Sequence, residues 1–324
     1  MTDELAIDVR GLHKGFGGGT EGAGLNGIDL GVPRGTVCGL LGPNGAGKTT
    51  AVRILATLMR PDAGTVRVAG HDVRTQARQV RSRIGLVGQH AAVDEILDGR
   101  QNLVMFARLN HLSTRDAHRR ADELLADLSL EDTGRQPVST YSGGMRRRLD
   151  LAAGLIVAPD VLLVDEPSTG LDPSGRRDVW AALRRLVDAG TTVLLTTQYL
   201  EEADFLADRI TMLAAGRVVG EGTPDELKAR LGSDWIEVQA ADAEDARSIA
   251  AIGQQLGEAE VGVDGLWVRI PVADRARAVL ELAVRLREAD VVPADITVRR
   301  PSLDEVFFEL TADTGSVSGD EVAA

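Results

Sequence analysis

Short apolar runs alternate with segments of helical spacing over the first two thirds of the chain. Runs of strand length occur at residues 36–41 and 161–164, whereas Val52, Leu55 and Leu58 follow the spacing of one helix face. Fully apolar runs are typical of strands that are covered on both faces, as in a parallel sheet. The pattern therefore predicts an α/β fold in which helices cover both sides of a largely parallel sheet.

Two further changes of pattern predict an inserted part and an appended part. Residues 93–140 switch to helical spacing, which predicts a helical insert. After a predicted helix at residues 224–231, strands and helices alternate in a small α+β pattern, whose last helix begins at a capping box of Ser302 and Glu305. The predicted domains are residues 1–231 with the helical insert, residues 232–312, and a flexible acidic tail at residues 313–324.

The loop after the first apolar run carries the motif Gly42-x-x-x-x-Gly47-Lys48-Thr49. In this P-loop pattern the backbone N–H groups surround phosphates, the lysine reaches the outer phosphates and the threonine binds Mg²⁺. A glycine turn beside an ordinary surface lysine is the alternative, and the order strand, loop, helix disfavours it. The predicted phosphate-binding residues are Gly42, Pro43, Asn44, Gly45, Ala46, Gly47, Lys48, Thr49 and Thr50.

Two carboxylates, Asp165 and Glu166, follow directly after the apolar run at residues 161–164. Ligands of doubly wound sheets bind at the carboxyl ends of the strands, so both acids are expected near the phosphates. Asp165 would then hold Mg²⁺, directly or through water. Glu166 would accept a proton from the attacking water. Solvated acids that merely end a strand are the alternative.

A serine and two glycines, Ser142, Gly143 and Gly144, precede a segment of helical spacing. Free N–H groups at a helix start attract anions, so these residues form a candidate phosphate site. An ordinary helix cap has the same sequence pattern, and the three residues alone do not separate the two interpretations.

The ordered set of motifs resembles the nucleotide-binding subunit of an ATP-binding cassette (ABC) transporter, over about residues 5–230. The resemblance implies a P-loop NTPase fold, with ATP and Mg²⁺ as cofactors. It identifies the Ser142 segment as the signature motif, Gln89 as a loop glutamine at the nucleotide and its metal, and Asp172 as part of the segment that joins two subunits. Phe16 resembles the aromatic side chain that stacks on adenine. An ordinary loop role for Gln89 and a core role for Phe16 are the alternatives.

The chain contains one set of these motifs. In the family, each ATP lies between the P-loop of one subunit and the signature serine of another. The resemblance therefore implies a head-to-tail dimer of two copies. It also implies that the helical insert contacts an integral membrane permease, which would hold the chain at the cytoplasmic face of the cell membrane.

Two residues depart from the common family pattern. Met145 stands where the signature motif usually carries glutamine, but Ser142 and the glycines are intact. Gln198 follows the apolar strand that ends at Thr197, where the family usually has a histidine. A glutamine amide donates and accepts hydrogen bonds but takes no charge, so Gln198 is expected to contact the γ-phosphate and water without titrating. A regulator that binds ATP but hardly hydrolyses it is the alternative that Gln198 raises.

Composition is consistent with an enzyme that carries no membrane span of its own. The 324 residues have 44% hydrophobic content and a net charge of −13, which disfavours nonspecific binding to nucleic acid or anionic lipid. No apolar stretch of 18 residues or signal-peptide pattern is found. Arginine runs such as residues 146–148 are expected to be solvated or paired with carboxylates. The single cysteine, Cys38, is expected to be a buried thiol.

The closing stretch, residues 300–310, is similar to the C-terminal extension of drug-export ATPases of the daunorubicin-resistance type. The resemblance implies an ATPase subunit that powers export of a hydrophobic, anthracycline-like compound, which mainly the permease would contact. Export of a lipid or polyketide is an alternative. A soluble ABC ATPase that acts on nucleic acid or ribosomes is a second one, although the chain lacks the paired cassettes and basic extensions common among those proteins.

Overall fold

The computed structural model of the chain describes residues 5–16, 24–89, 92–230, 234–256 and 261–315. By their internal contacts they divide into two units, Met1–Pro224 and Asp225–Ala324. This division falls before the domain boundary predicted at residue 231. A glycine-rich loop is expected from the sequence at residues 17–24, and all of it except Gly24 lies outside the described residues, as does the tail beyond residue 315.

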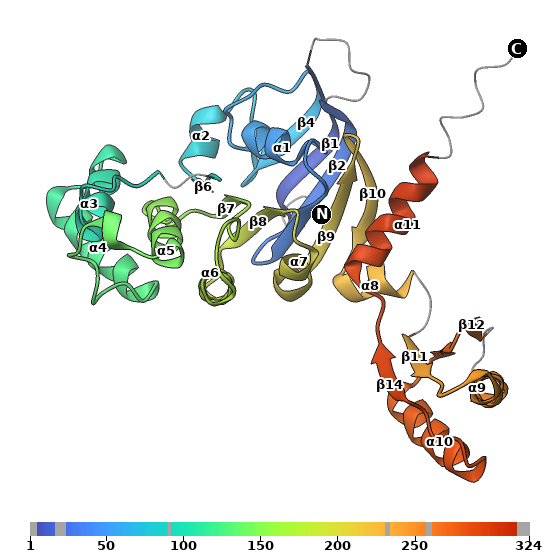
Figure 1. Cartoon of the computed structure of the whole chain (residues 1–324). Coiled ribbons are helices and arrows are strands. Elements are labelled where there is room, and N and C mark those ends of the chain that lie inside the picture. The colour runs from blue at the N-terminus through green and yellow to red at the C-terminus, as the bar shows by residue number, and fades with distance from the viewer. Residues whose placement is uncertain (1–4, 17–23, 90–91, 231–233, 257–260, 316–324) are drawn as a thin grey trace, which may run out of the picture. The chain divides into compact units, whose positions relative to one another are not determined.

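A six-stranded sheet forms the centre of the first unit (Figure 1). Its strands run in the order β10-β9-β3-β8-β7-β6. The five strands from β9 to β6 pair in parallel, and β10 adds an antiparallel edge. The strands are β3 (Val37–Leu41), β6 (Ile84–Val87), β7 (Val161–Asp165), β8 (Thr192–Thr197), β9 (Arg209–Ala214) and β10 (Arg217–Gly222). The α/β fold expected from the apolar runs is confirmed.

A second, antiparallel sheet in the order β2-β1-β4-β5 completes this unit. It comprises β1 (Leu5–Gly15), β2 (Gly24–Pro33), β4 (Ala63–Val68) and β5 (His71–Asp72). Apolar side chains of β1, β2 and β4 share one core with helix α1 and with one face of the central sheet. The P-loop helix is therefore held between two sheets, which fixes its position.

Helices of the first unit begin where short polar side chains cap their free N–H groups. Asp98, Ser113, Ser142 and Asp172 each accept a hydrogen bond from the backbone at the start of α3, α4, α5 and α6. The helices are α1 (Lys48–Leu55), α2 (Ala77–Arg81), α3 (Gly99–Leu109), α4 (Thr114–Asp127), α5 (Gly143–Gly154), α6 (Pro173–Asp188) and α7 (Leu200–Leu206). Helices α3 and α4 lie in the segment predicted as a helical insert.

Strand β7 shows why the central strands are apolar throughout. Val161 and Leu163 belong to the core shared with α1, whereas Leu162 and Val164 belong to the core under α3 to α6. Alternate side chains thus enter two different cores, as expected for a sheet covered on both faces. In β3 the same alternation buries Cys38, which is 1% exposed and whose pKa burial raises to about 12.

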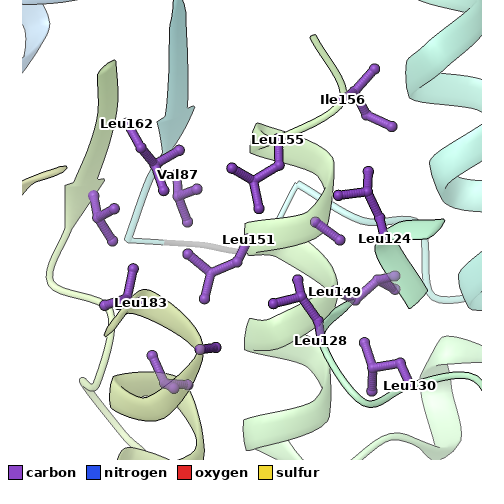
Figure 2. Close-up of a cluster of buried hydrophobic side chains, with 14 of the residues drawn as sticks. Val87, Leu124, Leu128, Leu130, Leu149, Leu151, Leu155, Ile156, Leu162 and Leu183 are labelled. Atoms are coloured by element: carbon purple, nitrogen blue, oxygen red, sulfur yellow. The ribbon is translucent and has the colours of Figure 1, made fainter. Parts of the chain in front are cut away.

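Helix α5 bridges the central sheet and the helical insert (Figure 2). Leu151 and Leu155 point toward the side chains of the sheet and α6, among them Leu162. Leu149 points the other way, toward Leu128 after α4. Both contacts belong to one continuous buried cluster, so α5 is packed on two sides.

The P-loop helix is shorter than its apolar spacing predicted. Helix α1 ends at Leu55, and Thr57 takes a left-handed φ of +61°. Leu58, which the periodicity placed on the buried face, is 65% exposed. The helix ends at a turn and not at a polar residue, so the apolar spacing of the sequence continues past the end of the helix.

The second unit contains a four-stranded antiparallel sheet in the order β12-β13-β11-β14. With its two helices it follows the sequence order β-α-β-β-α-β, which is that of ferredoxin-like folds. Residues such as Ile236, Val268 and Leu282 form its core. Its elements are β11 (Asp234–Gln239), α9 (Ala243–Leu256), β12 (Gly262–Asp264), β13 (Trp267–Val272), α10 (Arg275–Glu288) and β14 (Asp295–Arg299).

Two helices flank this sheet in the sequence, α8 (Pro224–Ala229) and α11 (Leu303–Gly315). The predicted capping box is present, because Ser302 Oγ accepts from the N–H of Glu305 at 3.2 Å and the N–H of Ser302 donates to the Glu305 carboxylate at 2.8 Å. Helix α11 continues to Gly315, into the segment predicted as a tail. Among all described helices, none has the length and apolar character needed to cross a bilayer.

Candidate nucleotide site

The predicted site residues follow the carboxyl ends of four adjacent strands. In the order β3, β8, β7, β6, these strands lead to the P-loop, Gln198, Glu166 and Gln89. Parallel pairing brings their ends to one edge of the sheet. This edge is where open α/β sheets bind ligands.

The P-loop backbone leaves the start of α1 open. Gly47 is the N-cap of this helix, with φ +107°, and no side chain caps the first turn. The free N–H groups there are a ready anion site. Gly42, at φ +155°, lies so close to the carbonyl of Leu213 that a Cβ atom would collide with it. Glycine is therefore required at this end of the loop.

Lys48 folds back over the loop rather than into solvent. Its Nζ donates to the carbonyl oxygens of Gly42 at 2.6 Å and Pro43 at 3.1 Å, and lies 3.8 Å from Oε1 of Glu166. Burial lowers the pKa of Lys48, while the carboxylates of Glu166 and Asp165 oppose that shift. The ammonium group is thus held at the site by the residues that surround it.

Thr196 on β8 links the two carboxylates of β7. Its hydroxyl donates to Oδ1 of Asp165 and accepts from the N–H of Glu166 at 3.2 Å. Glu166 has a left-handed φ of +48°, which is strained for a residue with a side chain. Thr169 donates to its other carboxylate oxygen at 3.3 Å. These contacts hold a buried carboxylate in an unusual backbone conformation, as is common at functional sites.

A pocket of about 380 Å³ opens at this edge. It brings together many of the predicted residues, and Phe16, 47% exposed, forms part of its wall. The lining residues are Phe16, Gly24, Asn44, Gly45, Gly47, Lys48, Thr49, Thr50, Gln89 and Glu166. Gly42, Pro43 and Ala46 complete the loop behind it, and Asp165 lies next to Glu166 in the sequence.

The remaining predicted residues do not line this pocket. Ser142 and Asp172 are exposed, and their side chains cap α5 and α6 by accepting from Met145 N–H at 3.2 Å and Gly175 N–H at 2.9 Å. Gly143 is exposed beside Ser142, whereas Gly144 packs against Gly175. Gln198 is exposed immediately after β8. Within one chain, Ser142 therefore does not line the pocket that the P-loop residues line.

The donor set fits a hard divalent cation. Thr49 and Gln89 line the pocket, and Asp165 is the last residue of β7. Together they offer hydroxyl, amide and carboxylate oxygens, which are ligands that Mg²⁺ prefers. Among the described residues no group of three or more His, Cys, Asp or Glu side chains could hold a metal by itself. A cation here would therefore rely on mixed ligands and on the phosphates of its substrate.

Sequence reasoning missed three residues of this region, one of which, Gly24, lines the pocket. Thr196 was assigned only to a strand, although a polar residue inside a buried run is a signal of a local role. Arg147 was expected to be solvated or paired with a carboxylate. It is paired with Asp150 at 3.1 Å, but it is only 6% exposed, so the solvated interpretation is wrong for this residue. Its neighbours Arg146 and Arg148 are less buried.

The parallel sheet, the open P-loop helix and the two acids define a P-loop ATPase. The family model for the ABC transporter matches residues 25–169. The chain is 63% identical over 235 residues to daunorubicin resistance ATP-binding protein DrrA3 of Streptomyces coeruleorubidus, covering 72% of this chain and 73% of the relative. It is 50% identical over 257 residues to doxorubicin resistance ATP-binding protein DrrA of Mycobacterium tuberculosis, covering 79% and 77%.

A solved dimer of an ATP-binding cassette in a post-hydrolysis state, bound to ADP and phosphate, is similar in structure. Its TM-score is 0.59 at 25% identity, covering 67% of this chain and 98% of that one. The chain belongs to the ABC transporter family of ATP-binding proteins. Its members hydrolyse ATP and work as dimers with a membrane permease, so the chain is an ATPase.

Proposed function

We propose that the chain is the ATP-hydrolysing subunit of an exporter that moves a hydrophobic, anthracycline-like drug through a separate membrane permease. The observation that carries the ATPase part is the pair Lys48 and Glu166, buried together beside an open P-loop helix. The cargo part is supported by 63% identity to a daunorubicin resistance ATP-binding protein. No comparable observation favours a ribosome or nucleic acid as the target.

The P-loop residues would bind the phosphates of ATP. The free N–H groups at the start of α1 and the ammonium of Lys48 would hold the negative charge, and Phe16 at the pocket wall would stack on the base. Thr49, Gln89 and Asp165 would hold Mg²⁺, which supplies charge neutralisation on the phosphates when it is bound. ATP and GTP offer the same phosphates, so the pocket wall would set the preference between them.

Glu166 would act as the general base of hydrolysis. It would take a proton from water as the water oxygen attacks the γ-phosphorus and the bond to ADP breaks. Thr196 and Thr169 would keep the carboxylate in place. Gln198 would contact the γ-phosphate and water through its amide, without a change of charge.

A second copy would complete the site. Ser142, Gly143 and Gly144 begin a helix and are separate from the P-loop of their own chain. We propose that they bind the nucleotide of the partner, and that Asp172 lies at the joint between the copies. ATP binding would then close the dimer and hydrolysis would open it, while the helical insert would pass the movement to the permease at the cytoplasmic face of the membrane.

The partner is tested by capturing the closed state. Glu166→Gln in the native host, with ATP and mild detergent, should retain a polytopic membrane protein that mass spectrometry identifies. Lys48→Ala is the matched control, because it should bind ATP weakly and therefore retain no additional partner when ATP is added. Recovery of ribosomal or DNA-repair proteins instead would contradict the transporter assignment.

The cargo is tested with the permease so identified. Cells that contain both proteins should accumulate less daunorubicin than cells in which the chain carries Lys48→Ala. Equal accumulation of daunorubicin, together with ATP-dependent export of a lipid or polyketide, would favour the alternative cargo.

A further inference from the structure

Arg147, on the second turn of α5, contacts two separate segments of the nucleotide site, one at the end of β7 and one after β6. Its Nε donates to the carbonyl of Pro167 at 3.0 Å, and its Nη2 donates to the carbonyl of Asp165 at 3.0 Å. Its Nη1 donates to the carbonyl of Gly88 at 2.6 Å and to Asp150 at 3.1 Å. The rigid fork of a guanidinium group suits such simultaneous contacts, and an ammonium group does not.

Two of these contacts hold the backbone directly before and after Glu166. The carbonyls of Asp165 and Pro167 lie on either side of it, and the N–H of Glu166 itself is held by the backbone oxygen of Thr196 at 3.0 Å. The left-handed backbone of Glu166 is strained, and such strain persists only where the surroundings fix it. Arg147 is therefore part of what directs this carboxylate toward Lys48.

The other contacts hold the backbone on both sides of Gln89. Arg147 holds the carbonyl of Gly88, directly before Gln89. Its partner Asp150 accepts from the N–H of Ala92 at 2.9 Å, on the far side of the same loop. The pair thus holds the chain on both sides of a residue that lines the pocket.

The helix that carries this pair is well suited to transmit movement. Leu149 and Leu151 pack α5 between the helical insert and the central sheet (Figure 2). The side chain of Ser142 caps the start of the same helix, so the capped end and the buried pair Arg147 and Asp150 belong to one element. A shift of α5 would therefore move the backbone beside Gln89 and Glu166 together.

Stability alone does not account for a charge pair at this position. Burial lowers the pKa of Arg147 and raises the pKa of Asp150, so both groups are costly to hold in charged form. Buried ion pairs are often replaced by apolar residues without loss of stability. The hydrogen bonds to three site carbonyls are what an apolar pair could not supply.

We infer that Arg147, held by Asp150, is a positioning residue for ATP hydrolysis, which aligns Glu166 and Gln89 with each other and ties both to the signature helix α5. The inference rests on the proposed roles of Glu166 and Gln89 in this site. Arg147 contacts neither substrate nor metal in this role, and acts through the backbone of the residues that do.

The test compares two variants of the full chain by steady-state phosphate release and nucleotide binding. Arg147→Lys keeps the charge opposite Asp150 but cannot reach the three carbonyls together. Arg147→Met with Asp150→Leu removes both buried charges and serves if the lysine variant does not fold. Both should lower kcat about 10- to 100-fold, the scale of a small misalignment of catalytic groups, while KM for ATP changes less than about threefold.

Arg83→Lys is the matched control. Arg83 pairs with Asp160 at 3.0 Å at the amino ends of β6 and β7, the same two strands whose carboxyl ends Arg147 joins. It should leave kcat and KM near the wild-type values. Wild-type kcat in Arg147→Lys, or an equal loss in Arg83→Lys, would overturn the inference.

Glu166→Gln in the same assay separates this inference from the function on which it rests. If Glu166→Gln abolishes turnover and Arg147→Lys does not lower it, the positioning role is wrong and the general base stands. If Glu166→Gln leaves turnover unchanged, the proposed role of Glu166 is wrong, and the inference about Arg147 is overturned with it.

Discussion

Nζ of Lys48 lies 3.8 Å from Oε1 of Glu166, and both side chains are buried. The cation proposed to bind phosphate and the carboxylate proposed to activate water thus face each other directly. Lys48 also donates to two P-loop carbonyls. These contacts fix the ammonium group between the P-loop and the carboxylate.

Replacing the carboxylate should separate binding from turnover. Glu166→Gln should lower kcat about 10²- to 10⁴-fold, because the general base is lost. Its affinity for ATP should rise, because a negative charge beside the phosphates is removed and Lys48 loses a competing partner. Phosphate release and fluorescent-nucleotide titration measure the two effects. Unchanged turnover would exclude Glu166 as the base.

The hydroxyl of Thr196 should matter for catalysis as well as for stability. Thr196→Val keeps the shape of the side chain but removes its bonds to Asp165 and Glu166, at a cost of about 1–3 kcal/mol in the free energy of unfolding. Turnover should fall as well. Thr192→Val is the control, since Thr192 accepts from Gly35 at the other end of β8. Equal losses of turnover in both variants would show a general packing effect.

Gly42 and Gly45 of the P-loop should respond differently to alanine. Both have positive φ, but a Cβ at Gly42 would collide with the carbonyl of Leu213, whereas Gly45 faces open space. Gly45→Ala should therefore cost only the backbone strain, about 1–2 kcal/mol. Gly42→Ala should cost more, as measured by urea unfolding. The reverse order would contradict the described loop.

Because Gln198 does not titrate, the pH profile of hydrolysis should show no transition from a histidine at this position. Gln198→His should retain turnover within about tenfold and add a transition near pH 6.5, the ordinary pKa of imidazole. The measurement is kcat/KM between pH 5.5 and 9 for both proteins. Superimposable profiles would mean that the side chain at this position does not take part in the reaction.

Glu202 should make the protein less stable as pH rises. Burial raises its pKa, and hydrogen bonds from Thr197, Trp180 and Ser168 oppose the shift only in part. The folded state then holds the proton more tightly than the unfolded state. Its stabilising effect is complete below the unfolded pKa and is lost as pH rises through the raised folded pKa.

Glu202→Gln removes this titration and keeps an acceptor for Trp180. The variant should therefore gain in free energy of unfolding relative to the wild type as pH increases from 4 to 8. Denaturant unfolding at several pH values measures the difference. A difference that does not change with pH would show that Glu202 has the same pKa in both states.

Much of the first unit could be predicted because its strands enter two cores and are apolar throughout. The P-loop and the acids after β7 could be placed for the same reason, since motifs at the ends of such strands meet at one edge. The three-residue strand β12 was missed because all of its residues, Gly262 to Asp264, are exposed and carry no apolar alternation. It is defined by its pairing with β13 alone.

The contacts of Arg147 could not be predicted for a different reason. The acceptors are backbone carbonyls of Gly88, Asp165 and Pro167, and a carbonyl is the same in every residue. The sequence shows that Arg147 is a hydrogen-bond donor, but it does not show which backbone carbonyls elsewhere in the chain accept from it. Ser142 shows the same limit, because a helix cap and a phosphate ligand require the same side chain.

Cys38 can report local opening of the central sheet. It is the single cysteine of the chain, it lies in β3 between β8 and β9, and its pKa is raised to about 12. A thiol of this kind is inert to alkylating reagents while the strand is in place. The rate at which a maleimide labels it therefore measures how often the strand before the P-loop leaves the sheet. Slower labelling in the presence of ATP would show that bound nucleotide makes this opening of the sheet rarer.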